Sequence, residues 1–109
     1  MSRGLGCHNA LDFANTAAQH ATLPAGIGSG LNDYTVSCWV KIRTFSNFAR
    51  VFDFGNGTTN YMFLTPQFAT GGNSAQMRFA IRTPSTNEQQ INSSIALPLN
   101  TWVHVAVTL

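Results

Sequence analysis

Charge is scarce in this sequence. Of 109 residues, six are Lys or Arg and four are Asp or Glu, so the charged fraction is 9%, where roughly 25% is usual. The six basic residues are Arg3, Lys41, Arg43, Arg50, Arg78 and Arg82. They form no run and the net charge is only +2, which excludes the basic surface of a nucleic-acid-binding protein. The hydrophobic fraction of 44% argues against disorder, and a surface of Asn, Thr, Ser and Gln is typical of secreted β-proteins.

Long hydrophobic runs are also missing. No stretch approaches the roughly 20 apolar residues of a membrane-spanning helix, so we expect no membrane partner. The first residues show neither the basic nor the apolar region of a signal peptide. The length is sufficient for one domain with one core.

Cysteine is rare as well. Cys7 and Cys38 are the two cysteines, 31 positions apart. Whether they form a disulfide stays open, because the bond requires an oxidising compartment and a geometry that sequence does not give. Cys38 alternates with apolar residues, which predicts a small apolar side chain in the core. Neither cysteine has the CxxC spacing of a zinc or redox site.

Alternation of apolar and polar residues predicts strands along most of the chain. The clearest is 33–42, DYTVSCWVKI. One face carries Tyr34, Val36, Cys38, Val40 and Ile42, and the other carries Thr35, Ser37, Trp39 and Lys41. Because the second face is half polar, the pattern favours an antiparallel sheet with one solvated side.

Residues 48–63, FARVFDFGNGTTNYMF, predict a central hairpin. Asn56 and Gly57 both tolerate positive φ, so residues 55–60 indicate a turn between two apolar runs. Further strands are expected at 8–14, 76–82, 88–95 and 101–109, and no helical periodicity with a cap and a stop occurs. Many short strands with regular turns predict a β-sandwich or barrel.

The last predicted strand reaches residue 109 without a turn after it, so we expect a partial domain. A partial sandwich exposes a strand edge and an apolar inner face. We therefore expect self-association through that edge.

Six segments of the chain resemble laminin-G-like, concanavalin A-like jelly-roll domains, in particular the bacterial type found beside glycoside hydrolases. The segments are NALDF, TLPAGI, DYTVSCWVKI, RVFDFGNGTTNYMFL, MRFAIRT and LPLNTWVHVAVTL. They match the N-terminal part of the family domain in order and spacing. The resemblance implies an all-β, antiparallel β-sandwich (a concanavalin A-like jelly roll), apparently incomplete, over residues 8–109, with 1–7 as a tail or linker.

The resemblance also implies a function. It is non-catalytic recognition of plant or microbial polysaccharide by an accessory module of a secreted glycoside hydrolase; the alternative is a protein-interaction or adhesion module of the same fold. In the pentraxin branch, the turn that corresponds to residues 55–60 supplies an Asp-Asn pair to calcium. Asn60 fits as a metal ligand, while Thr59 stands at the Asp position and removes a charge that calcium favours.

Sugar sites pair an aromatic ring with side chains that hydrogen-bond hydroxyl groups. The candidates near loops are Phe45, Asn47, Asn60 and Tyr61. Trp39 and Trp102 lie within strands, where we expect core or inter-sheet packing. Arg78 and Arg82 share a strand face, which is either one side of a groove or a solvated surface.

Catalytic patterns are weak. A glycosidase needs two facing carboxylates, and the acids Asp12, Asp33, Asp53 and Glu88 include no pair at i, i+2 spacing on one strand. The histidines are scattered, and His104 is expected to be packed. No GxSxG motif occurs. The sequence therefore predicts that the chain is not an enzyme.

Overall fold

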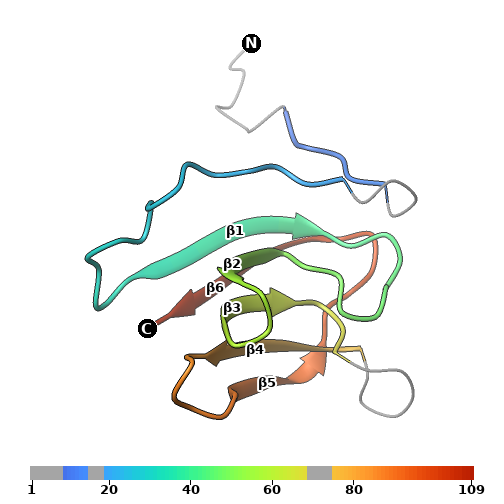
Figure 1. Ribbon diagram of the computed structural model, residues 1–109. Helices are drawn as coiled ribbons and strands as arrows, with labels where there is room; N and C mark the ends of the chain where they lie inside the picture. Colours follow the sequence, from blue (N-terminus) through green and yellow to red (C-terminus); the bar gives the residue numbers. More distant parts are fainter. Residues whose placement is uncertain (1–8, 15–18, 69–74) are drawn as a thin grey trace. The chain divides into compact units, whose positions relative to one another are not determined.

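The computed structural model describes residues 9–14, 19–68 and 75–109. In these ranges the chain forms six strands and no helix (Figure 1). The strands are β1 (Thr35–Lys41), β2 (Phe52–Asn56), β3 (Asn60–Thr65), β4 (Gln76–Arg82), β5 (Gln89–Ala96) and β6 (Trp102–Thr108). The all-β class and the predicted central hairpin, which is β2 and β3, are confirmed. Within the described ranges, accordingly, no helix is long and apolar enough to cross a membrane.

The strands form two antiparallel sheets. One contains β1 and β6, with Cys38 opposite Val105 and Trp39 opposite His104. The other has the order β2-β3-β4-β5. Its consecutive strands are neighbours, as hairpin connections require. This architecture is consistent with part of a jelly-roll β-sandwich.

The core lies between the inner faces of the two sheets. Its buried cluster consists of Met62, Leu64, Phe79, Leu97 and Val105, contributed by β3, β4, the residue after β5, and β6. Cys38 and Val40 of β1 pack against this cluster, as the alternation predicts. Cys38 is a free thiol, and burial raises its pKa. Cys7 lies outside the described residues.

Three predictions about individual segments are wrong. Residues 9–14 of the expected first strand form no strand, because a strand needs a neighbouring strand to hydrogen-bond with and no described strand pairs with them. Trp39 and Trp102 are not core residues, since 65% and 51% of their surfaces are exposed on the outer face of the β1–β6 sheet. His104 is exposed there too, with its ring centroid 5.3 Å from that of Trp39.

The chain divides into two compact units, Met1–Gly30 and Leu31–Leu109. All six strands belong to the second unit. In the first, the described residues form irregular backbone with a turn at 25–30, where the Ser29 amide donates to the Gly26 carbonyl. The site described below lies within the second unit.

Candidate functional site

The outer face of the four-stranded sheet carries a second set of aromatic and charged side chains. Along β3, Met62 and Leu64 point to the core, so Tyr61 and Phe63 point outward. The register places Asp53 of β2 opposite Phe63 and Arg82 of β4 opposite Tyr61. Residues opposite each other in a sheet share a face, so these side chains converge.

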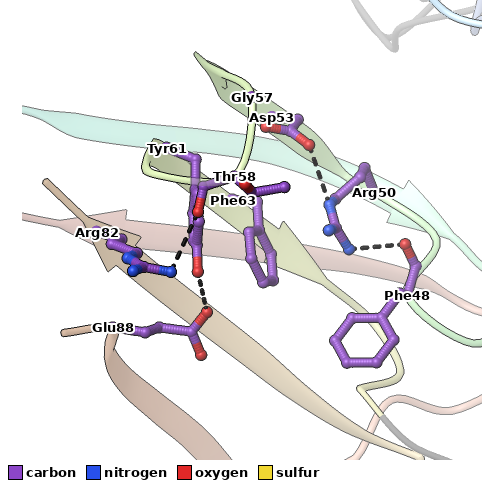
Figure 2. A pocket seen from close by; sticks show the side chains of 9 residues that line it. All are labelled: Phe48, Arg50, Asp53, Gly57, Thr58, Tyr61, Phe63, Arg82 and Glu88. Carbon is purple, nitrogen blue, oxygen red and sulfur yellow. Dashed lines mark hydrogen bonds and ion pairs between the residues drawn. The ribbon is translucent and has the colours of Figure 1, made fainter. Parts of the chain in front are cut away.

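A hollow of about 350 Å³ opens on this face. Figure 2 shows the side chains around it. It is lined by Phe48, Arg50, Asp53, Gly57, Thr58, Tyr61, Phe63, Arg82 and Glu88. The lining therefore combines strands β2, β3 and β4 with the segment before β2, the β2–β3 turn and the segment before β5.

One side of the hollow is built around the Phe63 ring. The Arg50 guanidinium lies 3.8 Å from the centroid of that ring, a cation–π distance. Its Nε donates to Asp53 Oδ2 at 3.1 Å, and its Nη1 donates to the Phe48 carbonyl at 2.7 Å. Phe63 is only 5% exposed. Arg50 thus covers Phe63 and fixes the backbone that carries Phe48.

The other side is a polar cluster. The Tyr61 hydroxyl donates a hydrogen bond to Glu88 Oε2. This bond to Glu88 is the main reason why the pKa of Tyr61 is raised, with burial adding to the effect and Arg82 opposing it. Arg82 Nη1 donates to the Thr58 carbonyl at 3.2 Å, while its Nε has no partner among the described residues. Because Nε is buried, any hydrogen bond from Arg82 to a ligand comes from its terminal Nη groups.

The structure brings one of the four predicted sugar-binding residues into the hollow. Tyr61 lines it. Asn60 is exposed at the start of β3, opposite Asn56, and is not part of the lining. Asn47 is exposed beside Phe48, and Phe45 is partly buried against the core cluster. Roles for Phe45, Asn47 and Asn60 in sugar binding stay predictions.

Sequence reasoning missed most of the lining, namely Phe48, Arg50, Asp53, Phe63 and Glu88. The groove considered for Arg78 and Arg82 is half right, because Arg82 lines the hollow while Arg78 does not. Arg78 bonds Asn92 of β5 and lies over the Phe68 ring instead. The hairpin register was the available signal, since it places the side chains next to Phe63 and Tyr61 on one face.

Asn60 is also the predicted metal ligand. Among the described residues, no group of three or more His, Cys, Asp or Glu side chains lies close enough to hold an ion. Asn60 and Thr59 offer an amide and a hydroxyl in an exposed turn, without the carboxylates that calcium prefers. A role of Asn60 as a calcium ligand stays a prediction.

A laminin G-type family model, described as the concanavalin A-like lectin/glucanases superfamily, matches residues 15–109. No curated protein and no solved structure gives a significant match.

Proposed function

Because the chain belongs to the concanavalin A-like lectin/glucanases superfamily, we propose that it is a carbohydrate-recognition module whose sugar-binding site is the hollow on the outer face of the four-stranded sheet. Family membership supports a carbohydrate-binding or interaction module in general. The hollow is where we propose that the sugar binds, and its combination of aromatic and charged side chains favours a sugar as the ligand.

One observation carries this proposal. The Phe48 ring, 43% exposed, lies on the same hollow as Arg82 and Glu88. A sugar has an apolar C–H face, which stacks on an aromatic ring, and a rim of hydroxyls, which accept from a guanidinium and donate to a carboxylate. Sites with an apolar surface and a few convergent polar groups are the usual form of small-ligand sites.

We further propose the biological setting that the sequence predicts. The chain serves as a non-catalytic accessory module of a secreted glycoside hydrolase that acts on plant or microbial polysaccharide. Two of its four acids, Asp53 and Glu88, line the hollow, but each already has a partner inside the protein, Arg50 and Tyr61 respectively. Because both carboxylates are already bonded to other side chains, we favour a role in binding over a role in acid–base catalysis.

The alternative function is a protein-interaction or adhesion module. The exposed tryptophans of the β1–β6 sheet favour it, since aromatic residues are enriched at protein interfaces. A glycan array separates the two functions. Binding to defined oligosaccharides supports the first, and silence supports the second.

A titration with matched variants tests the site. We expect the chain to bind arabinan or xylan oligosaccharides in isothermal titration calorimetry, and Arg82→Gln to weaken binding about tenfold or more, because a charged donor to the ligand is lost. Arg78→Gln, on the same strand but outside the hollow, is the control and should bind normally. Equal losses in both variants, or no heat with the parent chain, would contradict the proposal. Repeating the titration with a chelator tests the predicted role of calcium and Asn60.

A further inference from the structure

We infer that the hollow selects an uncharged sugar that presents two neighbouring hydroxyls to Arg82 and Glu88, and discriminates against uronic acids. This inference rests on the proposed function, because it names the class of sugar that the same site takes. It depends on which charged groups of the lining are still available to a ligand.

Arg50 is already engaged by other groups of the lining. Its Nε and Nη1 are already bonded to Asp53 and to the Phe48 carbonyl, and its planar face lies on Phe63. Asp53 in turn neutralises its charge at 3.1 Å. A carboxylate ligand that approached Arg50 would have to compete with Asp53, so this pair holds the shape of the hollow and does not attract anions.

Arg82 is the cation with donors to spare. A guanidinium has five N–H groups. This one donates from Nη1 to the Thr58 carbonyl, hydrogen-bonds the Tyr61 side chain, and has its Nε buried. The bond to Thr58 anchors Arg82 to the β2–β3 turn, as Figure 2 shows, and leaves further N–H groups for a ligand.

Glu88 is the complementary acceptor. Its Oε2 accepts from the Tyr61 hydroxyl, and a carboxylate has several lone pairs in all. In Figure 2 the Tyr61 hydroxyl points to the Glu88 carboxylate, and this bond holds the carboxylate on the hollow's edge. A donor and an acceptor thus face the same space.

Charge balance decides between the sugar classes. The lining contains Arg50, Arg82, Asp53 and Glu88, two cations and two anions. A uronate would gain attraction from Arg82 but meet repulsion from Glu88 while losing its hydration. A hydroxyl pair suits both groups, because one hydroxyl accepts from Arg82 and its neighbour donates to Glu88.

The test is a change of specificity. Xylo-oligosaccharides or arabino-oligosaccharides are titrated against oligogalacturonides with the parent chain, Glu88→Gln and Asp33→Asn. Asp33 is exposed and outside the lining, so Asp33→Asn changes the net charge equally and serves as the control. We expect the parent chain to prefer the neutral sugars and Glu88→Gln to raise the uronate-to-neutral affinity ratio about tenfold. The change should shrink at high salt.

The outcomes separate this inference from the proposed function. If oligogalacturonides bind the parent chain as well as neutral sugars and Arg82→Gln abolishes both, the site is a sugar site and the inference is overturned. If Glu88→Gln and Asp33→Asn shift the ratio equally, the effect is one of net charge, and the inference again fails. If no sugar binds any variant, the proposed function and the inference fall together.

Discussion

At the residue scale, Tyr61 ties the polar cluster together through its bond to Glu88. That bond raises the Tyr61 pKa above its ordinary value of 10.0. A raised pKa means that the neutral phenol is favoured in the folded state, so the stabilisation is complete below about pH 10 and is lost as pH rises through the folded-state pKa. We expect Tyr61→Phe to lower the free energy of unfolding by roughly 1 kcal/mol at pH 7, and urea denaturation to show this difference shrinking above pH 10.

The matching control changes Glu88, the hydrogen-bond partner of Tyr61. In a Glu88→Gln background the phenolate no longer meets a carboxylate, so the alkaline loss attributed to Tyr61 should be smaller, and a double-mutant cycle gives the coupling. A difference between the parent chain and Tyr61→Phe that stays constant from pH 7 to 11.5 would contradict the assigned cause.

The same cluster shows why the sequence predicted Tyr61 but not its partners. An aromatic residue at a turn is visible in the pattern, so Tyr61 was a candidate. Glu88 reaches it from 27 positions away, across the register of β3 with β4 and the β4–β5 connection. Phe48 depends on a backbone with φ of 54°, a conformation uncommon for a bulky residue.

At the element scale, the β2–β3 hairpin sets the shape of the site, and Gly55 is its tightest point. Gly55 lies opposite Tyr61. A Cβ at position 55 would lie 2.7 Å from the Asn60 carbonyl oxygen and 2.7 Å from Tyr61 Cα, both backbone atoms. Because backbone cannot rotate away, we expect Gly55→Ala to separate the strands, to lower the free energy of unfolding by about 1–3 kcal/mol, and to disturb the Tyr61 resonances in NMR spectra.

Gly28→Ala is the comparison for that experiment. A Cβ there meets nothing within 4 Å, so its effect on the urea midpoint should stay within about 0.5 kcal/mol. If both alanine variants behave alike, the close approach at Gly55 is not a structural constraint.

Strand prediction succeeded where a segment alternates apolar and polar residues and also has a neighbouring strand to pair with. Period-two patterning identified β1 and β4 closely, because each has one buried face and a neighbouring strand. It failed at 9–14, where Leu11 and Phe13 alternate but are 74% and 47% exposed. It also misplaced Trp39, because hydrophobicity alone does not say which face of a strand meets the core.

At the scale of the whole molecule, β5 is the edge at which we expect self-association. It is the longest described strand, with eight residues (QQINSSIA), and it carries no charge or proline. It pairs with β4 on one side only, and Ile91 and Ile95 are 71% and 74% exposed. Natural edge strands avoid pairing through charges, prolines and bulges; β5 lacks the first two, although its pairing with β4 has an irregularity.

An apolar-to-lysine change on this edge tests the expectation. Sedimentation velocity of the parent chain should show a species that grows with concentration, and Ile95→Lys should shift it toward monomer, because a lysine on the edge repels its copy in an antiparallel pair. Leu99→Lys, at a site 43% exposed outside the strands, should leave association unchanged. A parent chain that sediments as one monomeric species at every concentration would refute the edge mechanism, and equal effects of both lysines would reduce it to general charge repulsion.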